Sequence, residues 1–273
     1  MENQEIIKQL SWSNIDLFLQ CQRCFYNQLL FGIKRPTVDP ESFKLSKTID
    51  EKLKKEMNFF RGWKPHPTIM AKNKIEAIPF ENACVTKWKE SNYGKGGIRY
   101  HDKNLALTFC GAIDDVWINE DDALIIVEYK TTSTSLGETI EKNPWYKNFK
   151  RQISFYAWLF KMNGYKVHNN GYFVYCNGHK ESKSFLSFNN CLEFEVTCSP
   201  CTIDYSDVEE IIKHASDCLK HPNAPKSSIN CMFCKYHEKL QNSNYHNNLT
   251  IKEHQGYKTK IVNKIYYKDE NVT

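Results

Sequence analysis

The sequence predicts an α/β fold in which a mixed central β-sheet is flanked by helices. Helical segments come first, a β-hairpin follows, and a helix, two strands and a further helix complete the order. The chain of 273 residues is 41% hydrophobic and 14% aromatic, which is enough apolar material to bury a sizeable core. We therefore expect a single domain over residues 1–241 and a polar tail over 242–273.

The predicted hairpin lies in the middle of the chain. Residues 105–118 are rich in β-branched and aromatic side chains, 119–122 form a turn cluster, and 123–130 are a second apolar run. If the loop is 120–122, residues whose numbers sum to 242 lie opposite one another in the antiparallel ladder. The pattern therefore predicts two paired strands with a fixed register.

This register brings charged side chains together. Asp114 faces Glu128 across the hairpin, and the period of two along a strand places Lys130 on the same face as Glu128. Carboxylates this close are costly unless a proton or a cation lies between them. Mg²⁺ or Mn²⁺ suits such oxygen ligands, and Lys130 would orient or help deprotonate a water that attacks a phosphodiester. The alternative is that Asp114, Asp115 and Glu128 are solvated positions on an outer sheet face.

A helix is predicted directly after the hairpin. Asn143-Pro144 marks its first turn and Asn163-Gly164 its end, and Gln152 and Tyr156 share one of its faces. An apolar stripe at helical spacing lies beside this pair, so both side chains are expected at the edge of the packed face, next to the strands. The alternative is an ordinary amphipathic helix with a polar boundary. The stripe consists of Phe149, Ile153, Ala157 and Phe160.

Other elements frame this centre. A capping box beginning at Ser13 predicts a helix that runs to about Phe31, and a second helix is predicted over about 45–60, with Asp50 beside its apolar stripe. That stripe consists of Ile49, Leu53, Met57 and Phe60. Two further strands and a last helix are predicted at 171–176, 192–197 and 206–219.

The motifs resemble those of a known family. Gly-Ala-Ile-Asp114, the strand ending Val-Glu128-Tyr-Lys130-Thr-Thr, and the Gln152/Tyr156 pair look like the PD-(D/E)XK nuclease superfamily, in particular its RecB-like branch of AddB-type and CRISPR-adaptation exonucleases. The resemblance implies a restriction-endonuclease-like core with Asp114 and Glu128 as metal ligands. It also implies a catalytic Lys130 and a Gln-x-x-x-Tyr pair that supports the site and touches DNA.

The same resemblance assigns a role to the helix over 45–60. In RecB-like nucleases this helix often carries a metal-binding His four residues after a Gly, and here the pattern reads Ser46-Lys-Thr-Ile-Asp50. An Asp in place of His keeps an oxygen ligand that suits magnesium. Asp50 is therefore a candidate extra ligand, with a solvated helix aspartate as the alternative.

Cysteine spacing is the second strong feature. Cys21-Gln-Arg-Cys24 and Cys231-Met-Phe-Cys234 are C-x-x-C units near opposite ends of the predicted domain. Eleven cysteines without a recognisable secretion signal favour a reducing compartment, where such pairs more often bind metal than form disulfides. Four thiolates suit tetrahedral zinc or an iron-sulfur cluster. Burial of Cys24 as an ordinary core cysteine is the alternative.

The resemblance favours a cluster over zinc. Some RecB-like nucleases hold a 4Fe-4S cluster with one early and three late cysteines, which staples the N- and C-terminal parts of the domain. This chain lacks a cysteine after Cys234, and Cys24 would replace the missing ligand. The third unit, Cys198-x-x-Cys201, contains Pro200 and is predicted to be a loop or strand end.

Charge and hydropathy bound the function. The net charge of +5 is modest, and basic side chains gather on the two helices that carry Gln152 and Asp50, where they would line a phosphate-binding cleft or form solvated faces. They are Lys142, Lys147, Lys150 and Arg151, and Lys52, Lys54 and Lys55. No stretch resembles a membrane span or a signal peptide, so we expect a soluble, cytoplasmic protein.

Taken together, these features predict a Mg²⁺- or Mn²⁺-dependent deoxyribonuclease. Exonuclease action at DNA ends or in single strands, in repair or recombination, is what the resemblance implies. A helicase or repair partner would then separate the strands, because the sequence carries no phosphate-binding glycine-rich loop. The competing hypothesis is a catalytically silent DNA-binding or assembly module of the same fold. In a third hypothesis, the protein is a scaffold organised by zinc, and its carboxylates neither bind a metal nor take part in catalysis.

Overall fold

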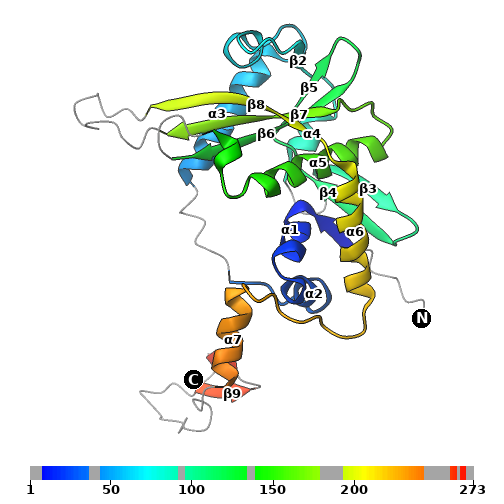
Figure 1. Cartoon of the computed structure of the whole chain (residues 1–273), viewed down its shortest axis with the longest axis vertical. Coiled ribbons are helices and arrows are strands. Elements are labelled where there is room, and N and C mark those ends of the chain that lie inside the picture. The colour runs from blue at the N-terminus through cyan, green and yellow to red at the C-terminus, as the bar shows by residue number, and fades with distance from the viewer. Residues whose placement is uncertain are drawn as a thin grey trace, which may run out of the picture. The chain divides into compact units, whose positions relative to one another are not determined.

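Figure 1 shows the computed structural model of the chain, in which two compact units are distinguished, Met1–Pro225 and Lys226–Thr273. The structure describes residues 8–36, 44–91, 96–133, 139–178 and 193–242, and the backbone of two later strands. In the second unit, α7 (Met232–Asn242) precedes the antiparallel pair β9 (Thr259–Val262) and β10 (Ile265–Lys268). Most of the predicted tail over 242–273 lies outside the described residues.

A five-stranded sheet is the centre of the first unit. Its strands run in the order β2-β5-β6-β7-β8, with β6 and β7 parallel and the other neighbours antiparallel. This mixture of directions agrees with the predicted mixed sheet. The bounds are β2 Ala77–Pro79, β5 Asp115–Asn119, β6 Leu124–Thr132, β7 Asn170–Gly178 and β8 Phe194–Thr202.

A smaller sheet adjoins it in the order β1-β4-β3, where β1 is parallel and β3 antiparallel to β4. Its strands are β1 (Lys8–Ser11), β3 (Ile98–Asp102) and β4 (Leu107–Gly111). Helices surround the two sheets, together with the short π-helix η2 and the 3-10 helix η3. Their bounds are α1 Trp12–Gln20, α2 Gln22–Phe31, α3 Lys44–Phe60, η2 Pro67–Ala71, α4 Val85–Lys89, η3 Ile140–Lys142, α5 Tyr146–Met162 and α6 Tyr205–Lys220.

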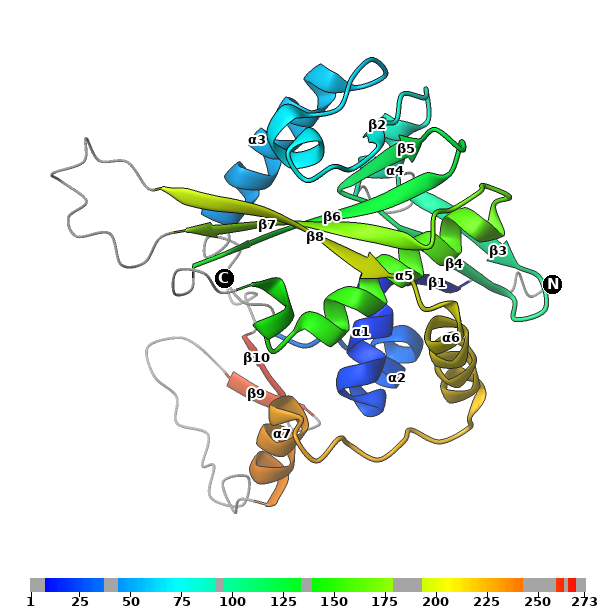
Figure 2. The same cartoon turned by 45° about the horizontal axis from the view of Figure 1, so that its top comes forward.

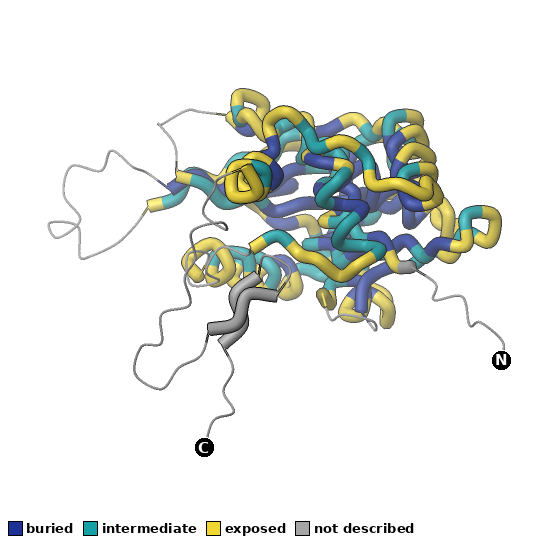
Figure 3. Tube along the Cα trace, turned by 90° about the horizontal axis from the view of Figure 1, so that it is seen from below, coloured by how far each residue is buried: buried dark blue, intermediate teal, exposed yellow. Residues whose placement is uncertain are grey.

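Two hydrophobic clusters cover the two faces of the larger sheet. Alternate residues of β6 point to opposite faces, so Ile126 packs with α5 while Ile125 and Val127 pack with Met57 of α3. Figure 2 shows α3 and α5 on opposite sides of β6, β7 and β8. In Figure 3 the buried residues run through the strands, whereas the outer surfaces of the helices are exposed. Glu128 therefore emerges on the α5 face of the sheet.

The predicted hairpin register is confirmed, but the length of its first strand is wrong. Asp115 pairs with Val127 and Ile118 with Leu124, as the sum of 242 requires. The run over 105–118 is not one strand, because β4 and β5 belong to different sheets. Between them the Ile113 N–H donates to the carbonyl of Trp88 at 3.1 Å rather than to a strand. Asp114 therefore lies just before the ladder, at the junction of the two sheets.

The predicted first helix is also corrected. Its N-cap is Ser11, two residues before the predicted Ser13, and the Ser11 N–H donates to the Asn14 side chain at 2.9 Å. It is divided at Cys21, whose extended backbone (φ −163°, ψ 108°) ends α1 and begins α2. The Cys21 N–H still bonds Leu17 and its carbonyl still accepts from Phe25, so the break leaves no backbone group of Cys21 unpaired.

Three helices agree closely with the prediction, namely α3, α5 and α6. In α3, however, only Met57 of the expected stripe is fully buried. Strand β8 is longer than predicted and ends at Thr202, so Cys198 and Cys201 lie in its second half, which agrees with the predicted strand end and not with a loop. Pro200 is tolerated there because β8 is the edge of its sheet and an edge strand has N–H positions that need no ladder partner.

Asp115 is a buried structural carboxylate, fully inaccessible and held by Arg61 Nη2 at 2.7 Å and the Tyr129 hydroxyl at 2.8 Å. We predict that Asp115→Ala destabilises the fold by about 3–5 kcal/mol, because it leaves a nearly buried guanidinium without its counter-ion. Chemical denaturation measures the loss. The matched control is Asp121→Ala in the exposed hairpin turn, with an expected change below about 0.5 kcal/mol. Equal losses for the two variants would contradict the prediction.

Candidate active site

Asp114 is held from two sides at the point where the sheets separate. Its Oδ2 accepts a hydrogen bond from the Tyr129 N–H at 2.9 Å, and its Oδ1 lies 2.9 Å from Lys54 Nζ. Its side chain remains 20% exposed. Asp114 and Asp115 are neighbours in sequence, yet Asp115 is directed into the fold. The first carboxylate is therefore available for binding, while the second is part of the core.

Glu128 is the most confined carboxylate of the site, at 4% exposure. Its Oε1 accepts from Lys130 Nζ at 2.8 Å and from Gln152 Nε2 at 2.7 Å. Its Oε2 is buried and has no hydrogen-bond partner among the described residues. Burial, with the negative charge of Asp114 as the next cause, raises the pKa of Glu128 to about 8.

These two carboxylates fit a divalent cation. A buried carboxylate oxygen without a partner costs free energy, and a second carboxylate nearby adds repulsion when both are ionised. A hard cation bound to Asp114 and Glu128 would satisfy the free oxygen and offset both charges. The donor set consists of oxygen atoms, which magnesium and manganese prefer.

Helix α5 closes the site from one face of the sheet. Gln152 receives a hydrogen bond from Lys130 Nζ on its Oε1 at 2.9 Å and donates from its Nε2 to Glu128 and, at 3.3 Å, to the Tyr156 hydroxyl. The amide thus fixes the positions of an ammonium and a carboxylate at once. Burial and the charge of Glu128 raise the pKa of Tyr156 well above its usual value, so this hydroxyl stays protonated. The ring of Phe149 lies 4.7 Å from Lys130 Nζ.

Close packing requires a glycine at the start of the Gly-Ala-Ile-Asp motif. A Cβ placed on Gly111 would lie 2.5 Å from Cε1 of Tyr156, which is too close for any side chain. The backbone of β4 therefore passes directly over the tyrosine ring. This close approach ties the end of β4 to α5 and fixes where the following Asp114 emerges.

Helix α3 reaches the site from the other face of the sheet. Lys54 Nζ lies 2.8 Å from Asp50 Oδ2 and 2.9 Å from Asp114 Oδ1, so one ammonium joins the two carboxylates. Burial and the charge of Asp114 raise the pKa of Asp50. The structure thus brings Asp50 next to Asp114 through Lys54. Sequence reasoning treated Lys54 only as one of several cleft lysines, although its i,i+4 spacing from Asp50 was the available signal.

The basic side chains expected to line a cleft differ in their roles. Arg151 donates to both oxygens of Asp207, at 2.7 and 2.9 Å, and its guanidinium lowers the pKa of Asp207. Arg151 is therefore engaged in a structural pair. Lys142 lies in η3 and not on the helix that carries Gln152, which corrects its predicted position. Lys52, Lys55 and Lys147 are exposed.

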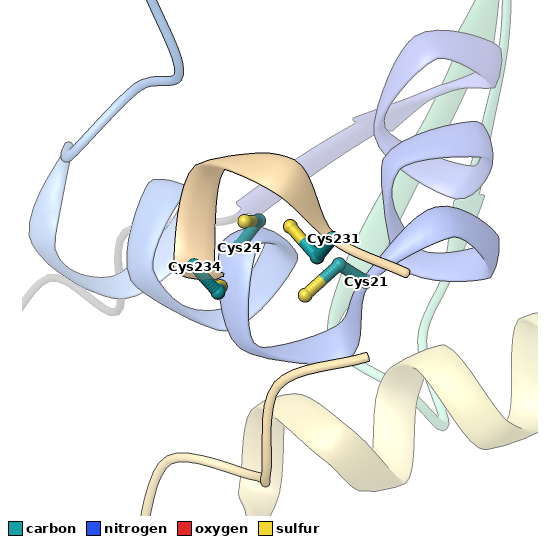
Figure 4. A group of neighbouring side chains, drawn as sticks. All are labelled: Cys21, Cys24, Cys231 and Cys234. Atoms are coloured by element: carbon teal, nitrogen blue, oxygen red, sulfur yellow. The ribbon is translucent and has the colours of Figure 1, made fainter. Parts of the chain in front are cut away.

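The four cysteines of the two predicted C-x-x-C units come together. One sulfur atom from each of Cys21, Cys24, Cys231 and Cys234 lies within 4.8 Å of the other three, and Figure 4 shows the side chains gathered around one point. Cys24 is half-buried and the other three are buried. The predicted juxtaposition of cysteines from the N- and C-terminal parts is confirmed, and four thiolates in this arrangement are positioned to bind a metal.

Comparison with known proteins identifies the family. The family model described as the PD-(D/E)XK nuclease superfamily matches residues 9–238. The chain belongs to this superfamily. A search of the curated proteins found no match. Among solved structures, one titled "Crystal structure of SSO0001" has 15% sequence identity and a TM-score of 0.41, with 87% of each chain covered, which is a distant likeness.

Membership of the PD-(D/E)XK superfamily confirms the predicted fold class and agrees with nuclease chemistry that uses a divalent metal. The narrower assignment to a RecB-like branch stays a prediction. In the described segments, no helix combines the length and the apolar character that a membrane span needs.

The pKa of Glu128 makes metal binding depend on pH. In the folded, metal-free chain its pKa is about 8, above the ordinary value of 4.5, so the ionised form costs stability. This cost is absent below pH 4.5, grows as pH rises and is complete above about pH 8. We predict that a saturating Mn²⁺ concentration raises the melting temperature more at about pH 8.5 than at about pH 6, because fewer protons compete for Glu128. Differential scanning fluorimetry measures both increments.

The control for this prediction is Glu128→Gln, which keeps an oxygen acceptor toward Lys130 but cannot ionise. It should lose most of the Mn²⁺-induced increment at both pH values. Equal increments for the native protein at the two pH values would contradict the assignment of Glu128 as the titrating ligand.

Proposed function

We propose that this protein is a Mg²⁺- or Mn²⁺-dependent deoxyribonuclease that hydrolyses phosphodiester bonds. The observation that carries the proposal is the buried Glu128 oxygen without a partner, next to Asp114 and on the same carboxylate that binds Lys130. A cation site and a fixed ammonium thus share one carboxylate. That combination suits the hydrolysis of a phosphodiester, which needs an activated water and stabilisation of the charge on the phosphate.

Asp114 and Glu128 are the proposed ligands. When bound, a divalent metal would stabilise negative charge on the scissile phosphate. Lys130 would hold the attacking water and stabilise the charge that develops on the phosphate oxygens, because its ammonium is fixed by Glu128 and Gln152. Gln152 and Tyr156 are proposed as positioning residues that also contact the nucleic acid. Asp50, the candidate extra ligand, holds Lys54 in this structure and could bind a metal only if Lys54 released its carboxylate.

DNA is the proposed substrate, and exonuclease action at ends or in single strands is the proposed mode. Support comes from the superfamily match together with the RecB-like motifs around Asp114, Glu128 and Gln152. The net charge of +5 is favourable for a polyanion but modest, so local contacts at the site must contribute most of the affinity. A role in repair or recombination, with a helicase as partner, extends the same proposal.

The cysteine cluster is proposed to hold a 4Fe-4S cluster, with zinc as the alternative. Four thiolates in one place satisfy the ligand requirement of either group. In both cases the metal is structural and is separate from the carboxylate site, because hard divalent cations prefer oxygen donors and soft ones prefer thiolates.

A nuclease assay tests the catalytic proposal. Lys130→Ala should lower the rate of DNA cleavage in Mn²⁺ by a factor on the order of 10² or more, since it removes a fixed charge at the phosphate. Single- and double-stranded DNA with free or blocked ends are the substrates, which separates exonuclease from endonuclease action. The matched control is Lys213→Ala, an exposed lysine of α6, which should retain full activity.

Full activity of Lys130→Ala would overturn the mechanism. No cleavage by the native protein, despite Mn²⁺ binding that depends on Asp114, would favour a silent DNA-binding module instead.

Absorption spectroscopy of anaerobically purified protein identifies the metal held by the cysteines. A 4Fe-4S cluster gives a broad visible band with bound iron, whereas zinc gives no visible band and is found by elemental analysis. Cys231→Ser should lose most of the bound metal, while Cys84→Ser, an exposed cysteine outside the cluster, should retain it. Retention of the metal by Cys231→Ser would refute the four-cysteine site.

A further inference from the structure

Lys54 occupies an unusual position beside the proposed metal site. Its Nζ lies 2.8 Å from Asp50 Oδ2 and 2.9 Å from Asp114 Oδ1, and the side chain is only 24% exposed. A single cation at these distances attracts both carboxylates and offsets part of their negative charge, as a metal ion between them would. The ammonium therefore offsets the charge of Asp114 at its Oδ1, while the charge of Asp114 also acts on Glu128.

The position of Lys54 is set by the packing of α3. Leu53 and Met57 of the same helix pack into the hydrophobic cluster on that face of the sheet. Asp50 precedes Lys54 by one helical turn, so their pairing follows from helix geometry, while the contact with Asp114 follows from how α3 lies on β6. The ammonium is thus carried by a helix that packs on the sheet, and its side chain is largely shielded from solvent.

The net charge of the site favours the binding of one divalent cation. If all groups are ionised, the carboxylates of Asp50, Asp114 and Glu128 face the ammonium groups of Lys54 and Lys130, which leaves one negative charge. One divalent cation reverses this to one positive charge, which suits an anionic phosphate. Two divalent cations would leave a strongly positive site and would require the second to displace Lys54. Asp114 has both oxygens bonded, whereas Glu128 keeps one oxygen without a partner in the described structure.

We propose that the Lys54 ammonium takes the place of a second metal ion, so that the site binds one divalent cation, between Asp114 and Glu128. Asp50 then acts as a positioning residue that holds Lys54, and it does not bind the metal. This inference rests on the proposed nuclease site and specifies its metal stoichiometry. Nucleases that cleave with two metals place them about 3.5–4 Å apart. Here the Lys54 ammonium lies 2.9 Å from Asp114 Oδ1, on an oxygen that a second metal would need.

Titration with Mn²⁺ alone tests the proposal without any activity measurement. Isothermal calorimetry and electron paramagnetic resonance are applied to the full chain and to Lys54→Met, which keeps an unbranched side chain and removes its charge. The native protein should bind about one Mn²⁺ at the Asp114-dependent site, and Lys54→Met about two, with a spin-coupled signal from neighbouring ions. The double variant Lys54→Met/Asp50→Asn should again bind about one Mn²⁺, because the second ion loses a ligand.

The matched control is Lys52→Met, an exposed lysine on the same helix, which should bind Mn²⁺ as the native protein does. Lys54→Gln serves as a second variant with the same expected stoichiometry if Lys54→Met does not fold. Two coupled ions in the native protein, or a single ion in a folded Lys54 variant, would overturn the proposal. Failure of the proposed nuclease site gives a different result. In that case, adding Asp114→Asn would leave Mn²⁺ binding unchanged in the native protein and in every Lys54 variant.

Discussion

The burial of the Glu128 carboxylate is the constraint on which the rest of the site depends. A carboxylate at 4% exposure is costly to ionise, and the surrounding structure compensates only in part. Lys130 and Gln152 both bond one oxygen, and the other is left without a partner in the described structure. Gln152 comes from α5 and Lys130 from β6. The packing of this helix on the sheet therefore also determines which groups surround the Glu128 carboxylate. Fold and chemistry are therefore fixed by the same contacts.

The junction of the two sheets explains why Asp114 is accessible and Asp115 is not. The chain leaves β4 over the ring of Tyr156, bonds Trp88 through Ile113, and only then enters β5. Asp115 is the first ladder residue and is directed toward Arg61, whereas Asp114 remains outside the ladder, where Lys54 of α3 reaches it. One carboxylate stabilises the fold, and the adjacent one stays partly exposed at the proposed cation site.

Local rules predicted much of this arrangement. The hairpin register followed from a loop of three residues, and the face shared by Gln152 and Tyr156 followed from helical spacing. The break before Asp114 could not be predicted, because apolar and β-branched residues on both sides of it resemble one strand and the break depends on a distant carbonyl. The division of the first helix at Cys21 likewise left no mark in the apolar pattern. The link from Lys54 to Asp114 joins segments 60 residues apart and arises only from tertiary packing.

These features connect metal binding to stability. Without a metal, the free energy of unfolding is reduced by a buried carboxyl group that ionises only at about pH 8, so the empty site is a local cost to the fold. Lys54 offsets the negative charges of Asp114 and Asp50, and of these three carboxylates only Glu128 has a buried oxygen without a partner in the described structure. On the proposed function, such a site would bind its cation by relieving an internal penalty, which suits a small, hard, divalent ion.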